Sequence, residues 1–190
     1  MPNTKARNAI GQVDFGYFCK GAYLARDLVR TKGWYSGTER LTPERAQTIL
    51  QRYGQERPVT ESDLPRLVAL RDRLRAVFTA GDETSVRRGI AGLLADFPAR
   101  LDLPAGGEGG MTFVPAAGDA VSWMGANAAT GLAFFVSEYG AARLGICNAS
   151  DCDDAFLDES KNRTKHYCSV GCARNENVRT FRARKKLGQQ

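Results

Sequence analysis

The sequence predicts a mainly helical α+β protein, in which a helical N-terminal domain with a β-hairpin is followed by a small cysteine-rich module. Three observations predict this class. Apolar residues recur at intervals of three and four over most of the first 140 residues. Apolar and polar residues alternate over 99–103, before a glycine-rich segment near 104–110 that leads into a second expected strand. Four of the five cysteines fall within 26 positions near the C-terminus, so we divide the chain into domains 1–140 and 141–190.

Length and composition agree with one ordinary folded domain and a small appended module. The chain has 190 residues, of which 43% are hydrophobic and 25% are charged, a mixture that supports a core and excludes wholesale disorder. The apolar stretch at 131–136 is too short to cross a bilayer, and the first ten residues lack the apolar run of a secretory signal. We therefore expect a cytoplasmic protein without a membrane partner.

Capping and breaking residues mark the elements of the helical domain. Thr42 stands directly before a proline, and Thr60 precedes Asp63 by three residues, both typical of helix starts. The apolar stripe of the third helix passes through Leu70 or Arg71. The expected helices cover about 15–32, 42–54, 60–81, 84–96 and 119–139, and a hairpin joins strands near 99–103 and 111–115.

The clustered cysteines have the spacing C-x4-C-x15-C-x3-C and are Cys147, Cys152, Cys168 and Cys172. Two close pairs separated by a loop that can fold back bring four thiolates to one tetrahedral ion, and we expect Zn²⁺. The alternatives are two disulfides, which a reducing cytosol disfavours, or four unrelated buried thiols. The expected fold of the module is a treble-clef-like zinc finger, whose second cysteine pair lies at a helix N-terminus, where the helix dipole stabilises thiolate charge.

Two further residues could take part in metal chemistry. His166 lies two residues before Cys168, but four cysteines already complete a tetrahedral shell, so we expect a surface or stacking role for it. Cys19 lies within an apolar helical pattern, where a lone cysteine behaves as a small hydrophobic residue.

Positive charge is concentrated at the C-terminus. The last thirty residues hold nine Lys/Arg and one acid, whereas the rest of the chain sums to −2, so this end is expected to face a polyanion. A helix is expected over 172–186. Val178 and Phe181 lie beside its cationic face and are expected to pack the helix against the cysteine-rich module or the helical domain. Arg and Asn on such a helix can read guanine and adenine in a major groove. The candidate nucleic-acid-binding residues are Arg174, Asn175, Arg179, Arg182, Lys185 and Lys186.

Three segments resemble a family of bacterial proteins that join an ABATE domain to a CGNR-type zinc finger. They are LARDLVRT at 24–31, TESDLPRLVALRDRLR at 60–75 and CNASDCDDAFLDESKNRTKHYCS at 147–169. Where the family pattern has Cys-Gly-Asn-Arg at the fourth ligand, this chain has Cys172, Ala173, Arg174 and Asn175. Members are described as candidate stress-induced transcription regulators, so the resemblance implies DNA binding.

Three classes of function compete on these observations. The favoured one is a DNA-binding transcription regulator that recognises double-stranded DNA, and the alternative is a non-specific RNA-binding or protein-interaction module. An enzyme is not expected, because the one histidine lies in the basic module and a four-cysteine ion has no open position for water. For the helical domain we expect a role as a sensor of a small-molecule effector or as a dimerisation module. Neither the oligomeric state nor the DNA target follows from the sequence.

Overall fold

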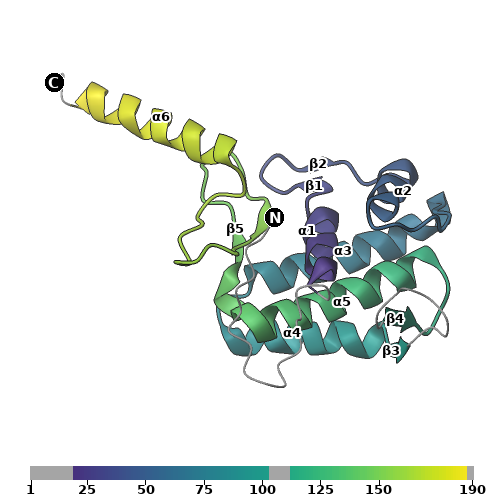
Figure 1. The fold of residues 1–190 in the computed structure, drawn as a ribbon. Coiled ribbons are helices and arrows are strands. Elements are labelled where there is room, and N and C mark those ends of the chain that lie inside the picture. The colour runs from purple at the N-terminus through teal and green to yellow at the C-terminus, as the bar shows by residue number, and fades with distance from the viewer. Residues whose placement is uncertain (1–18, 103–111, 188–190) are drawn as a thin grey trace.

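The computed structural model describes residues 19–102 and 112–187, and its helices form a bundle from which the last helix extends (Figure 1). The bundle consists of α1 (Lys20–Val29), α3 (Leu64–Thr79), α4 (Glu83–Asp96) and α5 (Ala120–Tyr139), with α2 (Pro43–Arg52) beside it. Two short 3-10 turns are η1 (Glu61–Asp63) and η2 (Ala141–Arg143), and the extending helix is α6 (Val170–Leu187). The predicted mainly helical α+β class is confirmed. Each helix of the described ranges is too short or too polar to cross a lipid bilayer.

The strands form antiparallel pairs, three of them within the described residues. They are β1 (Lys32–Gly33) with β2 (Thr38–Glu39), β3 (Ala99–Asp102) with β4 (Thr112–Pro115), and β5 (Leu144–Ile146) with β6 (Ala155–Leu157). Arg100 lies opposite Val114, so the hairpin predicted around the glycine-rich segment is confirmed. The predicted turn at 104–110 lies outside the described residues.

Helix α5 is the centre of the bundle and packs against both α1 and α4. Its crossing with α1 depends on two glycines. A Cβ atom on Gly21 would lie 1.9 Å from the carbonyl oxygen of Asn127, and one on Gly131 would lie 2.3 Å from the backbone nitrogen of Ala22. Because real Cβ atoms do not approach this closely, the two backbones can touch only where both residues are glycine.

The predicted helix starts are formed by side-chain caps. The side chains of Thr42, Asp82 and Asp119 each accept a hydrogen bond from the backbone N–H three residues on, at 2.9–3.2 Å. The backbone N–H of Thr60 donates to Asp63 at 2.9 Å, which is one half of the predicted capping interaction. The helix starts at Thr42 and Thr60 were predicted because these contacts use neighbours in sequence, whereas the cap at Asp82 was not predicted.

Helix α1 is shorter at its C-terminal end than the predicted range 15–32. Residues 15–18 lie outside the described part, and the helix ends at Val29 rather than at Lys32. The hydroxyl of Thr31 donates to the carbonyl of Leu28 at 2.7 Å, and the carbonyl of Thr31 accepts from the N–H of Arg40 at 2.9 Å. The second bond commits the chain to the β1–β2 hairpin and therefore stops the helix.

Both residues that the sequence offered for the apolar stripe of α3 are buried. Leu70 and Arg71 are each 1% exposed. Arg71 is tolerated inside because its Nη1 atom lies 2.5 Å from Oε1 of Glu39 and its guanidinium lies 5.7 Å from the ring centre of Trp34. This buried cation therefore fixes the β1–β2 hairpin onto α3.

The β5–β6 hairpin is joined to the bundle by apolar and polar contacts. Ala155 and Leu157 belong to the same buried cluster as the helices, and Nε of Arg30 donates to the carbonyl of Ala155 at 2.8 Å. Asp153 accepts from Nη2 of Arg75 at 3.1 Å. The division at residue 140 stays a prediction, but the C-terminal module shares a core with the helices.

Candidate metal centre and C-terminal helix

The four cysteines of the predicted metal site lie together in the structure. Cys147 follows β5, Cys152 lies in the turn before β6, Cys168 precedes α6 and Cys172 lies in the first turn of α6. All four Sγ atoms are within 4.8 Å of one another, with 3.7 Å from Cys152 to Cys168 and 3.6 Å from Cys168 to Cys172. Metal–sulfur bonds of about 2.3 Å in a tetrahedral site place the sulfurs about 3.8 Å apart. The four thiols are therefore positioned to bind one metal ion.

Backbone hydrogen bonds hold each pair in a tight turn. The N–H of Cys152 donates to the carbonyl of Ala149 at 3.1 Å, which closes the first turn, called here the knuckle (residues 147–152). The N–H of Cys172 donates to Oγ of Ser169 at 3.1 Å, as in an N-terminal helix cap. The second pair is therefore held at the positive end of α6, as the sequence predicted.

Residues 143–185 match the family model described as CGNR zinc finger. The C-terminal segment of the chain is therefore similar to this zinc-finger family. The matched zinc finger runs from the end of η2 into the last turns of α6 and contains all four thiols. Among curated proteins, none matches the chain.

The thiols of the zinc finger differ in proton affinity. Burial raises the pKa of Cys152 to about 11, and burial together with the neighbouring thiols raises the pKa of Cys168 well above its usual range. A hydrogen bond with Ser169 lowers the pKa of Cys172. As free thiols Cys152 and Cys168 therefore keep their protons at neutral pH, so a cation that binds here must displace those protons.

The other two candidate metal residues stay outside the cluster. Within the described residues the group that could hold an ion consists of thiols alone, and His166 is an exposed residue whose backbone carbonyl accepts from Asn148 at 2.9 Å. Cys19 is 2% exposed in the helical core, as predicted. All five cysteines lie in the described ranges and none forms a disulfide, so the disulfide alternative is not the arrangement in this structure.

Helix α6 is fixed to the knuckle by two of its side chains. Glu176 accepts from the N–H and the hydroxyl of Ser150 at 3.0 and 2.9 Å. Arg179 lies 2.9 Å from Asp151 and 2.9 Å from Glu176, and it also donates to Ser150. The hydrogen bonds from Ser150 lower the pKa of Glu176, and the bond to Asp151 raises the pKa of Arg179. One stripe of α6, which continues from Cys172, therefore faces the knuckle.

The structure separates Arg179 from the other predicted nucleic-acid-binding residues. Arg179 is held by two carboxylates, which points to a role in positioning α6. Among the described residues, the exposed basic and amide side chains of α6 without an ion pair are Arg174, Asn175, Asn177, Arg182, Arg184 and Lys185. The side chain of Lys186 lies outside the described part, so its predicted contact stays a prediction.

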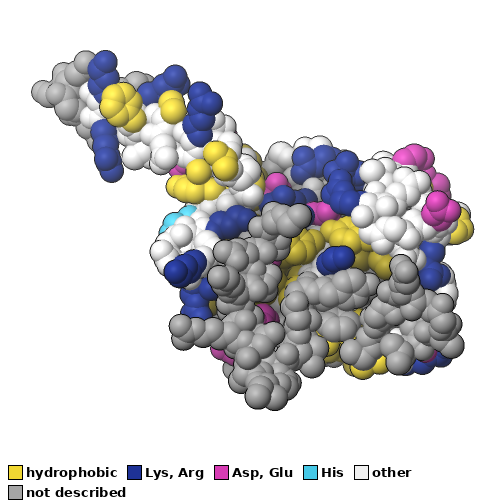
Figure 2. Space-filling view, in the orientation of Figure 1, with side chains coloured by type: hydrophobic (Ala, Val, Ile, Leu, Met, Phe, Trp, Pro, Cys, Tyr) yellow, Lys and Arg dark blue, Asp and Glu magenta, His cyan; other side chains and the backbone are white. Residues whose placement is uncertain are grey.

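The expectation that Val178 and Phe181 pin α6 is wrong. Val178 is 42% exposed and Phe181 is 69% exposed, and Figure 2 shows hydrophobic side chains on the surface of the extending helix among Lys and Arg. Helical periodicity explains the difference. Cys172 and Arg179 face the knuckle, and residues at 178 and 181 lie on the opposite side of the helix.

Sequence reasoning missed the acidic residues that orient the zinc finger. Asp151 holds Arg179, and Asp153 accepts from Arg75 and from the backbone N–H of Tyr35, the latter at 3.0 Å. Three aspartates surround Cys152, and between Arg143 and Lys161 the sequence has acidic residues but no basic one, although the chain after Ser160 is basic. That local reversal of charge was visible in the sequence and could have identified these contacts.

Proposed function

We propose that this protein is a transcription regulator that binds double-stranded DNA through the exposed side of α6. One observation carries the proposal. Helix α6 extends away from the bundle with exposed basic side chains that have no ion pair among the described residues, while its one acid, Glu176, is turned to the knuckle (Figures 1 and 2). Because the one acid faces the knuckle, the exposed side of α6 is positively charged and is suited to binding a polyanion.

The side of α6 opposite the knuckle defines the proposed DNA-facing surface. Arg174, Val178, Phe181 and Lys185 are spaced by four, three and four positions, so they form one stripe, and Arg182 lies beside it. A helix with side chains is about 10–12 Å across and fits the major groove of B-DNA, about 12 Å wide. In this arrangement an arginine reads guanine, Lys185 contacts phosphate and Phe181 contacts a thymine methyl group.

We assign Zn²⁺ to the thiol cluster, with a structural role. Four thiolates from Cys147, Cys152, Cys168 and Cys172 make the closed shell that is typical of structural zinc. A closed shell leaves no position for an activated water, which supports a protein that is not an enzyme. The ion would hold the knuckle and the start of α6 together, and the bonds of Glu176 and Arg179 would set the direction of the helix.

The helical domain and the location of the protein complete the proposed function. The resemblance of residues 24–31 and 60–75 to ABATE-domain segments supports an ABATE-like domain that carries the zinc finger, in a regulator of the stress-induced kind. Reduced thiols are maintained in the cytoplasm, where we place the protein.

Selection of bound duplexes from random DNA, with zinc measured on the same sample, tests the proposal. A common base motif is the expected result, and Arg182→Ala should weaken retention of all selected duplexes. Arg88, an exposed residue of α4, supplies a matched control, since Arg88→Ala should leave selection unchanged. Equal retention of unrelated duplexes would exclude sequence-specific recognition.

Non-specific binding of RNA or single strands is the second candidate, and the exposure of Phe181 favours it. An aromatic ring that is 69% exposed between basic side chains can stack on an unpaired base. Tighter binding of a single-stranded oligonucleotide than of the same sequence as a duplex, lost in Phe181→Ala, would select this candidate over the first.

A further inference from the structure

An open hollow of about 440 Å³ lies where the helical bundle meets the zinc finger. Its described lining residues are Arg30, Arg40, Arg45 and Asp154. Arg30 caps the C-terminal end of α1, Arg40 follows β2, and Arg45 lies in the first turn of α2. Asp154 directly precedes β6. Figure 2 shows Lys and Arg side chains gathered on the surface between α2 and the extending helix. Three guanidinium groups from separate parts of the chain therefore meet at one hollow.

Backbone carbonyls hold two of these arginines in place. Nε of Arg30 donates to the carbonyl of Ala155 at 2.8 Å, and Nη2 of Arg40 donates to the carbonyl of Arg30 at 3.2 Å. The side chain of Arg45 makes no hydrogen bond and no ion pair within the described residues, while its backbone N–H bonds to Thr42. Each guanidinium has five N–H donors, so most donors of the three groups are available to a ligand.

The three cations have no carboxylate partner among the described residues. The neighbouring acids are paired elsewhere, since Glu39 lies 2.5 Å from Arg71 and Asp153 lies 3.1 Å from Arg75. Asp154 lines the hollow but forms no ion pair with the arginines. Three positive charges and one negative charge give the lining a net charge of +2. Because like charges repel each other, an anion between the guanidiniums would be favoured.

The lining residues fit a small phosphate ester. The planar fork of an arginine matches two phosphate oxygens at once. A volume of about 440 Å³ lies within the range of about 300–1,000 Å³ that is usual for small-molecule sites. The carboxylate of Asp154 would repel a second phosphate, but it can accept a hydrogen bond from a hydroxyl group. A phosphorylated sugar offers such a hydroxyl, whereas the backbone of DNA does not.

We propose that this hollow binds a phosphate monoester of a small hydroxylated molecule, such as a phosphorylated sugar. The phosphate would lie among Arg30, Arg40 and Arg45, and a hydroxyl group would face Asp154. The backbone carbonyl of Asp154 also accepts from the N–H of Cys147, the first thiol of the metal site, at 2.9 Å. A bound ligand would therefore connect α1 and α2 to the turn that carries the thiols. This inference does not depend on DNA binding, because none of the three arginines belongs to α6.

Calorimetric titration of the full chain with inorganic phosphate and with glycerol phosphate, at constant ionic strength, tests the site. For inorganic phosphate a Kd on the order of 1 mM is expected, and glycerol phosphate should bind more tightly because it adds hydroxyl groups. Arg45→Gln removes one cation of the hollow and should weaken both probes about tenfold. Asp154→Asn should reduce the preference for glycerol phosphate. Arg88→Gln removes an exposed cation of α4 outside the hollow and should change neither affinity.

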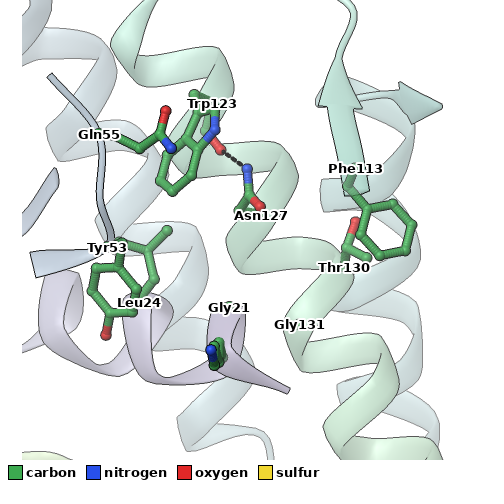
Figure 3. Close-up of a pocket in the computed structure, with 10 residues that line it drawn as sticks. Gly21, Leu24, Tyr53, Gln55, Phe113, Trp123, Asn127, Thr130 and Gly131 are labelled. Carbon is green, nitrogen blue, oxygen red and sulfur yellow. Dashed lines mark hydrogen bonds between the residues drawn. The ribbon is translucent and has the colours of Figure 1, made fainter. Parts of the chain in front are cut away.

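NMR spectra recorded during the same titration locate the probe. A second hollow, of about 210 Å³, lies between α1, α5 and β4 and is lined by Trp123 (Figure 3). The two hollows have no described lining residue in common. The Nε–H signal of Arg30 should therefore shift with the calorimetric Kd, while the indole N–H signal of Trp123 should stay unchanged.

Several results would overturn the proposal. Absence of saturable phosphate binding excludes the site, as does binding that Arg45→Gln leaves unaltered in a variant that melts like the parent. Glycerol phosphate that binds no more tightly than inorganic phosphate excludes the hydroxylated ester. If neither probe binds and Arg45→Gln instead weakens binding of duplex DNA, the three arginines contact the DNA backbone and not a small molecule.

Discussion

Arg179 and Arg182 lie within one turn of each other on α6, and the structure predicts different effects of their replacement on the salt dependence of DNA binding. Arg179 lies 2.9 Å from Asp151 and 2.9 Å from Glu176, whereas Arg182 is exposed with no ion pair among the described residues. A cation already neutralised by two carboxylates releases few counterions from DNA. Arg182→Ala should therefore reduce the salt dependence of DNA binding, and Arg179→Ala should leave it close to the parent value.

The expected magnitude follows from the exposed cations of α6. Four of them, Arg174, Arg182, Arg184 and Lys185, have no ion pair within the described residues. At about −0.9 per phosphate contact they give a slope of about −3.6 for log K against log salt, so doubling the salt weakens binding about 12-fold. Arg182→Ala should bring the slope to about −2.7, for which the same doubling weakens binding about 6-fold.

Fluorescence anisotropy of a labelled duplex, measured between about 0.1 and 0.2 M salt, gives these slopes. Arg88→Ala on α4 is the control for a general loss of positive charge, and zinc content and helicity are measured on every variant. Arg179→Ala should instead increase hydrogen exchange in α6, because the helix loses its bonds to the knuckle. If both α6 variants reduce the slope by the same amount, the assignment of Arg179 to a positioning role is refuted.

Three further predictions concern the metal, the bundle and the joint between them. Cys168→Ser should lose the ion in elemental analysis, and zinc affinity of the parent, measured against a competing chelator, should fall as pH is lowered, because protons compete for thiols such as Cys152, whose pKa is about 11. Gly131→Ala should lower the free energy of unfolding by about 1–3 kcal/mol or more in chemical denaturation, since its Cβ would meet the α1 backbone, while Gly81→Ala, with open space around it, should not. Asp153→Ala should cost about 1–3 kcal/mol and increase hydrogen exchange in the β5–β6 hairpin before the helices, and unchanged exchange there would contradict its role in the joint.

The elements that the sequence predicted correctly depend on residues close together in the chain. Thr42 and Asp119 cap helices through N–H groups three positions away, so the sequence alone places those starts. The metal site is also local, since the spacing of Cys147, Cys152 and the second pair allows one compact arrangement of four thiols. The end of α1 was predicted less well, because a hydrogen bond from Arg40, eleven positions beyond Val29, decides it.

Side-chain roles that depend on which face of a helix meets its neighbour required the tertiary structure. The sequence places Arg179 and Phe181 on α6, but whether either faces solvent depends on how the helix sits against the knuckle. Burial of Arg71 likewise depends on Glu39, a partner 32 positions away. The close crossing of α1 and α5 depends on Gly21 and Gly131, two glycines distant in sequence at which the helix backbones meet. Periodicity thus determines which residues share a face, and only long-range packing decides what that face contacts.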